Sequence, residues 1–382
     1  MTALSISAAF DGGNIEVVSL DCAEDIQLRI RPDVGEQFYQ WFYYRLVGAQ
    51  GRDCRMRLLN AAGASYAQGW EDYRAVASYD RQTWFRVPTR YQQGELIIDH
   101  CPEQNSVYYA YFAPYSWERH QDRLAAVQQQ PGVQVDTLGC SLDGRELDLV
   151  HIGNQTGEHG DARLRIWVTA RQHPGETMAE WLMEGLIDRL LDTADPVRRA
   201  LLERAEFYLV PNMNPDGSVR GHLRTNAVGV NLNREWQAPS LARSPEVYRV
   251  LERMQSTGVD LYLDIHGDET LPYNFVAGCA GNPDFSVRMA ELERAFTTEL
   301  LHVSPDFQDQ YGYTANQFGA ETLTLASNQV GHRFGCLSLT LELPFKDNAQ
   351  RPDSRYGWSP QRSQHLGRAL LGPILALLDR LR

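Results

Sequence analysis

Apolar positions along the chain follow two different rhythms, and the change falls near residue 115. In the first stretch apolar and polar residues alternate, for instance over residues 26–30 and 54–58, which is typical of half-buried strands. Turn-forming residues such as Asp11-Gly12-Gly13 separate the alternating segments. We therefore predict a small antiparallel β-sandwich domain in residues 1–115.

From residue 116 onward the apolar residues form continuous runs that are typical of buried strands. Four of these runs occupy residues 164–170, 207–211, 261–266 and 337–342. Between the runs, apolar residues recur at three- and four-residue spacing, most clearly after Glu176, which indicates amphipathic helices. Serines in N-cap positions mark the starts of other helices, at Ser116, Ser244 and Ser359.

This alternation predicts an α/β fold for residues 116–382, with a mixed β-sheet flanked by helices. Two domains also suit a chain of 382 residues, because single hydrophobic cores stop growing at a smaller size. Leucine spacing from Leu366 to Leu381 predicts a last amphipathic helix, and we expect Pro373 to bend it.

Three residues with metal-binding side chains lie at or just after the ends of two predicted strands. His173 and Glu176 follow the run 164–170 at a spacing of three, and His266 ends the run 261–266. Catalytic zinc commonly takes three such ligands and leaves a fourth position for water. An isolated His-x-x-Glu pair is a weak signal in a chain with 10 His and 49 acidic residues. The case for a metal site therefore depends on the other motifs of the chain.

Those motifs resemble, in order, the motifs of the zinc carboxypeptidase family. They are residues 173–176 (His-Pro-Gly-Glu), 214–217 (Asn-Pro-Asp-Gly), 221–224 (Gly-His-Leu-Arg), 229–236 (Gly-Val-Asn-Leu-Asn-Arg-Glu-Trp) and 264–267 (Asp-Ile-His-Gly). The His-Pro-Gly-Glu form resembles the cytosolic carboxypeptidase branch, and residues 41–45 and 111–116 are similar to parts of the small β-domain of that branch. The resemblance covers about residues 38–345. Lys346 is the only lysine of the chain, a bias that favours a bacterial source with a GC-rich genome.

The resemblance implies a role for each matching side chain. His173, Glu176 and His266 would bind one zinc ion per chain, and Arg224 would polarise the scissile carbonyl and stabilise the oxyanion. Asn233 and Arg234 would hold the terminal carboxylate of the substrate, which suits a guanidinium because it binds a carboxylate in two-pronged fashion. Glu342, at the end of the run 337–342, would be the general base.

Two features depart from the family pattern. Many relatives carry Asp where this chain has Asn231, and that Asp orients one zinc-binding His. Tyr311 and Tyr313 lie in the part of the chain where digestive relatives have a tyrosine that closes over the substrate, but they align poorly and receive no role.

The cytosolic branch implies a preference for acidic C-terminal residues, as in a deglutamylase. Such a pocket needs a buried positive group. Arg333, with His332 beside it, is the candidate for this substrate-binding role because it lies near the expected specificity loop, although a solvated basic turn is an equally good interpretation.

The sequence therefore predicts a zinc metallocarboxypeptidase that hydrolyses the C-terminal residue of peptides or proteins. Two alternatives stay open. One is a zinc-dependent deacylase of N-acyl amino acids, which shares the His, Glu and His ligands, and the other is a non-catalytic peptide-binding module on the same fold.

The composition indicates which partners and which cellular location to expect. A net charge of −13 without a basic stripe argues against nucleic acid. The first 20 residues lack an export signal, and no apolar stretch reaches the roughly 18 residues of a membrane span. The six cysteines show no C-x-x-C pairing, as expected of reduced thiols, so we expect a cytoplasmic protein. The sequence leaves the oligomeric state unknown.

Overall fold

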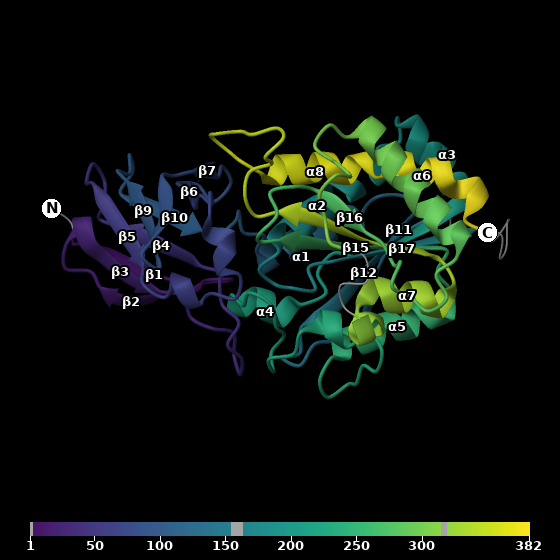
Figure 1. The fold of residues 1–382 in the computed structure, drawn as a ribbon, viewed down its shortest axis with the longest axis horizontal. Coiled ribbons are helices and arrows are strands. Elements are labelled where there is room, and N and C mark those ends of the chain that lie inside the picture. The colour runs from purple at the N-terminus through teal and green to yellow at the C-terminus, as the bar shows by residue number, and fades with distance from the viewer. Residues whose placement is uncertain (1–2, 154–162, 315–318) are drawn as a thin grey trace.

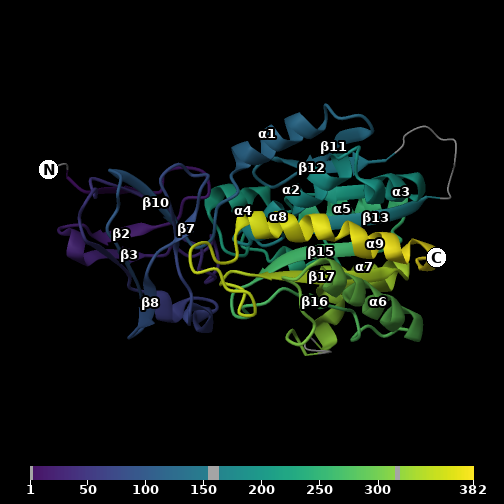
Figure 2. The same cartoon turned by 90° about the horizontal axis from the view of Figure 1, so that it is seen from above.

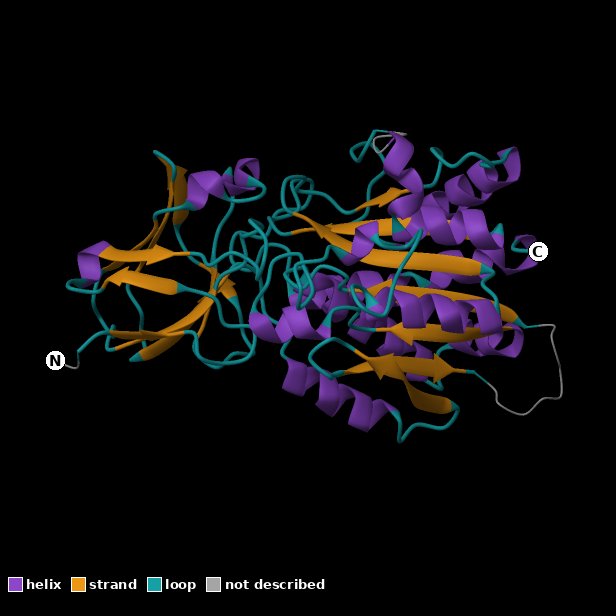
Figure 3. Cartoon of the chain, turned by 90° about the horizontal axis from the view of Figure 1, so that it is seen from below, coloured by secondary structure: helices purple, strands orange, loops and turns teal. Residues whose placement is uncertain are grey.

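The computed structural model describes residues 3–153, 163–314 and 319–382. An N-terminal region of two sheets lies beside a larger region in which helices cover both faces of one sheet, and the chain begins and ends at opposite ends of the molecule (Figure 1). Loops gather between the two regions (Figure 3). The fold class is the one predicted from the sequence.

The N-terminal region consists of two five-stranded sheets, as the alternating pattern predicts. In spatial order the first contains β1 (Ser5–Ser7), β4 (Tyr43–Val47), β10 (Ser106–Ala110), β6 (Val76–Ser78) and β7 (Phe85–Arg86). The second contains β2 (Glu16–Ser19), β3 (Ile26–Arg29), β5 (Cys54–Leu58), β9 (Glu95–His100) and β8 (Thr89–Gln92). Neighbouring strands are antiparallel, with the exception of β3 and β5, which run parallel.

The larger region contains a seven-stranded sheet. Its spatial order is β11 (Val133–Cys140), β12 (Glu146–Ile152), β14 (Ala205–Val210), β13 (Leu164–Ala170), β15 (Leu261–Asp268), β17 (Leu337–Pro344) and β16 (Phe275–Ala277). The four central strands, from β14 to β17, are parallel, and the outer pairings are antiparallel. The four apolar runs predicted as strands are these four central strands. Strands β15 and β17 end two residues later than predicted, and β14 begins two residues earlier and ends one residue earlier.

Helices cover this sheet on both faces, which is why its central strands are apolar throughout. One face packs against α2 (Thr177–Leu191), α3 (Pro196–Arg204), α6 (Val287–Val303), α8 (Pro360–Ala369) and α9 (Leu371–Leu377). The other face packs against α5 (Pro245–Thr257) and α7 (Ala326–Phe334). Two further helices, α1 (Trp117–Val127) and α4 (Pro215–Arg220), lie toward the N-terminal region (Figure 2).

The predicted last helix is interrupted close to Pro373, at Leu370, whose backbone dihedrals stay in the right-handed helical region. Helix α8 ends at Ala369 and α9 begins at Leu371. Pro373 explains the break, because its ring clashes with the carbonyl four residues earlier, which is that of Ala369.

The two regions share one continuous hydrophobic core. Tyr111, just after β10, stacks on Phe345, just after β17, with ring centroids 4.5 Å apart. The side-chain amide of Asn14 donates to the carbonyl of Gly221 at 2.8 Å, next to α4. The N-terminal region therefore packs against the edge of the sheet where the parallel strands end.

Among the described residues no helix is long and apolar enough to cross a bilayer. All six cysteines are unpaired.

Candidate metal and substrate site

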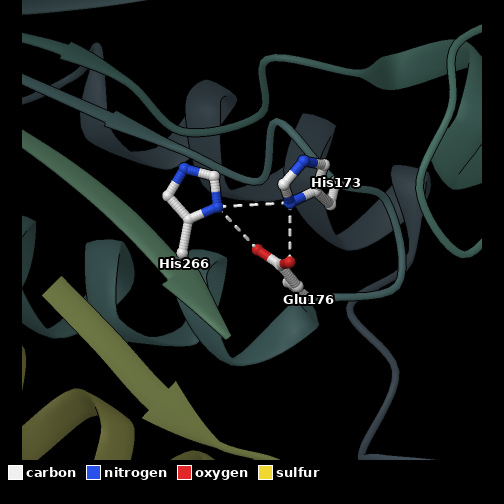
Figure 4. A group of neighbouring side chains, drawn as sticks. All are labelled: His173, Glu176 and His266. Carbon is white, nitrogen blue, oxygen red and sulfur yellow. Dashed lines mark hydrogen bonds and ion pairs between the residues drawn. The ribbon is translucent and has the colours of Figure 1, made fainter. Parts of the chain in front are cut away.

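Three buried side chains from distant parts of the chain meet at the carboxyl ends of β13 and β15. His173 follows β13, Glu176 is the residue before α2, and His266 lies in β15 (Figure 4). One oxygen of Glu176 lies 2.7 Å from Nδ1 of His173 and the other lies 2.9 Å from Nδ1 of His266. The two Nδ1 atoms are 3.3 Å apart. The residues predicted as ligands therefore converge on one point.

Hydrogen bonds at the far side of each ring fix which nitrogen faces that point. Nε2 of His266 lies 2.8 Å from the carboxylate of Asp264, and Nε2 of His173 lies 3.0 Å from Oδ1 of Asn231. Both partners are acceptors, so each Nε2 acts as the donor to its partner and each Nδ1 is the nitrogen that could bind a metal. Asn231 thus occupies the place of the orienting Asp, with a neutral amide oxygen.

This donor set fits a zinc ion. Two imidazole lone pairs and a carboxylate are the ligand types that zinc prefers, and acceptors packed so closely repel one another unless a cation lies among them. The pKa of His173 is lowered to about 4, mainly by burial and also by the nearby Arg224 guanidinium, so this ring is neutral at pH 7. For Glu176, the two histidines outweigh burial and lower the pKa of the carboxyl, which keeps it ionised.

Local contacts hold the turn that carries His173 and Glu176. Arg171, with a backbone φ of 59°, donates from its guanidinium to the carbonyl of Pro174 at 3.0 Å and to Glu180 at 2.7 Å. The backbone N–H of Gly175 donates to the carbonyl of Leu223 at 2.9 Å, and a β-carbon on Gly175 would lie 3.0 Å from that oxygen. The His-Pro-Gly-Glu turn is therefore tied to the segment that carries Arg224.

A cavity of about 560 Å³ opens beside the three donors. It is lined by every predicted site residue other than Arg333, namely His173, Glu176, Arg224, Asn233, Arg234, His266 and Glu342. One cavity thus holds the candidate ligands together with two guanidinium groups and four further carboxyl groups, those of Asp268, Glu269, Glu293 and Glu342.

Glu342 lies beside His266, because β15 and β17 are parallel neighbours in which these two residues are register partners. Its side chain is buried, and Oε2 has no hydrogen-bond partner among the described residues. The pKa of Glu342 is raised to about 8, mainly by burial and also by the carboxylates of Glu176 and Asp268, which together outweigh the lowering effect of His266. A buried carboxyl of this kind is suited to exchange a proton.

Arg224 is held between groups from both regions of the molecule. Its guanidinium carbon lies 5.4 Å from the ring centroid of Tyr66 and 6.0 Å from that of Phe38, within cation–π range. The buried carboxylate of Asp33 accepts hydrogen bonds from the backbone N–H groups of Leu223, Arg224 and Thr225. The N-terminal region therefore contributes directly to the wall of the cavity.

Asn233 and Arg234 belong to a short 3₁₀ helix, Leu232–Arg234, and are half-buried. Asn233 accepts from the backbone N–H of Ala326 at 2.8 Å, which connects it to the start of α7. Arg234 donates to the Asn233 carbonyl at 2.7 Å. Burial lowers the pKa of Arg234 and the neighbouring Arg224 adds to this effect, so two positive groups face the same space.

The structure removes Arg333 from the site. Its side chain is exposed near the end of α7, and its guanidinium lies 3.2 Å from the amide oxygen of Gln255 on α5 when that amide is oriented to accept. His332 is also exposed and lies 2.9 Å from a carboxylate oxygen of Asp284. The exposure of both residues, and their position outside the cavity, favour the solvated basic turn over a substrate-binding role.

Several residues of the cavity could not be identified from the sequence. The hydroxyl of Tyr313, left without a role, lies 2.6 Å from Asp268 and 3.3 Å from Glu342 Oε1. Tyr66 and Glu293 also line the cavity, although they are far from every motif. Tyr311 is exposed and stacks on Tyr273.

Comparison with known families identifies the class of protein. The model of the zinc carboxypeptidase family matches residues 121–366, and the model of the cytosolic carboxypeptidase N-terminal domain matches residues 6–112. The chain therefore belongs to the zinc carboxypeptidase family, which is zinc-dependent, and it is a metallocarboxypeptidase.

Individual relatives agree with this assignment. A metallo-carboxypeptidase from Burkholderia cenocepacia has a TM-score of 0.96 and 52% identity, covering 98% of this chain and 99% of its own. The metallo-carboxypeptidase from Pseudomonas aeruginosa, solved in complex with (2-guanidinoethylmercapto)succinic acid, has a TM-score of 0.95 and 45% identity, covering 99% and 100%. Cytosolic carboxypeptidase 6 of Mus musculus is 28% identical over 87% of this chain, which spans 64% of that relative.

Proposed function

We propose that this protein removes the C-terminal residue from peptides or proteins, with one zinc ion held by His173, Glu176 and His266. The observation that carries the proposal is the convergence of these three donors in a cavity that also contains Arg224, Arg234 and Glu342. When bound, zinc supplies Lewis acidity to a water molecule and to the substrate carbonyl.

Glu342 is the group proposed to move the proton. Its carboxylate takes a proton from the attacking water and later delivers it to the leaving amine, a role that typically contributes about 10²- to 10⁴-fold. The burial and the unpartnered Oε2 support this assignment. The Tyr313 hydroxyl holds the other oxygen and so orients the carboxylate.

The two arginines have separate tasks in this proposal. Arg224 donates to the carbonyl oxygen, where negative charge develops in the transition state. Asn233 and Arg234 bind the free carboxylate at the end of the substrate, which restricts hydrolysis to the last peptide bond. Different contacts support these separate tasks. The backbone N–H of Arg224 donates to Asp33, whereas the guanidinium of Arg234 donates to the carbonyl of Asn233.

Mass spectrometry of peptide products tests the proposal. A peptide with a free C-terminus should become one residue shorter with zinc-loaded protein and stay intact after chelation, and its amidated form should survive. Glu342→Gln should retain zinc and lose turnover. Release of an acyl group from N-acyl amino acids without shortening of peptides would favour the deacylase alternative, and binding without turnover would favour the peptide-binding module.

The side-chain preference is a finer question. The resemblance implies an acidic preference, and a deglutamylase-like activity stays a prediction. Arg333, the cation expected to bind an acidic side chain, lies outside the cavity and so does not support this preference. The compound in complex with the Pseudomonas aeruginosa relative joins a guanidinium to a succinate, so it carries a positive group as well as carboxylates.

A further inference from the structure

The wall of the cavity formed by α6, α7 and the strands β16 and β17 contains small and neutral side chains. They are Val276, Ala277, Gly278, Ala280, Gly281, Thr322, Leu325, Ser327, Asn328 and Thr340. Among the described residues, the ionisable side chains of this wall are Glu293, on α6, and Glu342, on β17, which is the proposed general base. Helix α6 packs against β17, next to the edge strand β16 (Figure 1).

The carboxylate of Glu293 lies directly against the backbone of Gly278. A β-carbon placed on Gly278 would be 2.0 Å from Oε2 and 2.3 Å from Oε1 of Glu293. The backbone of Gly278 does not have a positive φ, so its conformation does not require glycine. Glycine is needed here because a side chain would collide with the carboxylate of Glu293. The absence of a side chain at Gly278 therefore lets the carboxylate of Glu293 reach the cavity wall.

Glu293 has no charge partner in the part of the chain that the structure describes. No ion pair or side-chain hydrogen bond reaches its carboxylate, and burial raises its pKa. The nearby polar groups bond to one another, since Ser327 lies 2.8 Å from Thr340 and Asn328 donates to Asn282 at 2.9 Å. A partly desolvated carboxylate without a partner is costly, and a cationic ligand offsets that cost.

In the described part of the chain, no cationic side chain lines the cavity at this wall. The basic lining residues of the cavity, among those described, are His173 and His266 at the metal point and the guanidinium groups of Arg224 and Arg234. The proposed function uses the guanidinium groups for the carbonyl and the terminal carboxylate. Among the described residues, this wall therefore has no positive side chain, and its ionisable side chains, Glu293 and Glu342, are both carboxyl groups.

We propose that Glu293 makes the enzyme select a basic residue, Lys or Arg, at the C-terminal position of its substrate. This inference rests on the proposed carboxypeptidase function and names its substrate class. A guanidinium or ammonium group bound by Glu293 forms a charge-assisted hydrogen bond, whereas a glutamate at the same position is repelled. The predicted preference is the reverse of the acidic one implied by the resemblance.

Peptides that differ only in the last residue test the preference. Zinc-loaded protein should cleave peptides ending in Arg or Lys with kcat/KM at least about tenfold above one ending in Gln, the expected size for one charge-assisted hydrogen bond. A peptide ending in Glu should be slower than the one ending in Gln. Equal or faster cleavage of the Glu peptide would overturn the inference while leaving the proposed function intact.

Substitutions assign the preference to Glu293. Glu293→Gln should abolish the advantage of Arg and Lys over Gln and leave cleavage of the Gln peptide within about threefold, because only the charged contact is lost. Gly278→Ala should reduce the same advantage, since the flexible carboxylate must move away from the new methyl group. Glu291→Gln, an exposed position on the same helix, is the control and should change nothing. An unchanged Arg-to-Gln ratio in Glu293→Gln would contradict the role of Glu293.

A binding measurement separates the two proposals. Calorimetry with the free amino acids should show that zinc-loaded protein binds L-arginine more tightly than L-glutamate, and that Glu293→Gln removes the difference. If no peptide is shortened, the proposed function fails, and this binding still decides the role of Glu293. Equal binding of both amino acids by the wild-type protein would overturn it.

Discussion

The carboxylate of Asp33 accepts a hydrogen bond from the backbone N–H of Arg224 at 2.8 Å, which joins a loop of the N-terminal region to the wall of the active-site cavity. The same carboxylate accepts from Leu223 at 2.7 Å and from both the N–H and the hydroxyl of Thr225 at 2.9 and 3.0 Å. The carbonyl of Leu223 in turn accepts from Gly175 in the metal turn. One buried acid thus supports the segment between the two halves of the site.

Asp33→Ala should therefore weaken both the fold and the reaction. Each buried donor left unsatisfied costs about 1–3 kcal/mol, so we expect a loss of about 3 kcal/mol or more in the free energy of unfolding. We also expect a lower kcat from a displaced Arg224. Urea unfolding and peptide kinetics measure the two effects. Asp53→Ala, at an exposed position in the same region, is the control. Equal results for both variants would contradict the supporting role of Asp33.

Arg224→Ala should lower kcat by about 10²- to 10³-fold, as for other dedicated oxyanion donors. The zinc content should not change, because Arg224 is not among the ligands. Arg333→Ala is the matched arginine control, and its kcat/KM should stay within about twofold of the wild-type value, as for other exposed substitutions. A comparable loss in both variants would mean that Arg224 has no special place in the reaction.

Arg234→Ala should remove the enzyme's discrimination between free and amidated C-termini. Loss of one charge-assisted contact to the carboxylate should raise KM for the free peptide by about tenfold or more. The measurement is the ratio of kcat/KM for a peptide and its amide. A variant that still rejects the amide as strongly as the wild type would show that another group recognises the carboxylate.

His120, which does not line the cavity, gives the fold a pH dependence of its own. Its ring lies between the carboxylates of Glu180, at 2.6 Å, and Asp148, at 3.1 Å. Burial alone lowers the pKa of His120, but these two carboxylates outweigh it and raise the pKa to about 9. Since the folded pKa exceeds the ordinary value of 6.5, the ion pairs contribute fully below pH 6.5, and the contribution is lost as pH rises through 9.

The free energy of unfolding should therefore fall more for wild type than for His120→Gln between pH 6.5 and 9.5, by up to about 3 kcal/mol. Denaturant unfolding at these two pH values measures the difference. His365→Gln, an exposed histidine, should follow the wild-type protein. Parallel pH profiles for wild type and His120→Gln would contradict the assignment.

Local pattern was sufficient to predict the framework of the site. The runs at residues 164–170 and 261–266 are apolar because helices cover both faces of the sheet, so their ends predicted where His173 and His266 meet. The order of motifs then predicted Arg224 and Glu342, which line the same cavity. Their chemical roles stay predictions until the variants above are measured.

Arg333 shows where sequence distance misleads. It lies nine residues before Glu342, yet Ser327 and Asn328 of the same helix line the cavity while Arg333 is exposed. At 3.6 residues per turn, a residue five or six positions further along α7 is rotated by about 120–140° from them. Arg333 therefore lies on a different face of α7 from the residues that line the cavity. A loose sequence alignment does not show which face a helical residue occupies.

Tyr66 and Glu293 could not be found from the sequence for another reason. Each reaches the cavity from an element without a motif, Tyr66 from the N-terminal region and Glu293 from α6. Their positions depend on how the two regions and the edge of the sheet pack, which periodicity along the chain does not encode. Only the assembled fold brings them beside Arg224 and Gly278.

Crystallography at the zinc absorption edge tests the central claim most directly. One anomalous peak per chain should lie about 2.0–2.2 Å from Nδ1 of His173, from Nδ1 of His266 and from the Glu176 carboxylate. His266→Ala should lose the peak and the peptidase activity together. An active enzyme whose zinc lies elsewhere, or which contains none, would contradict the account.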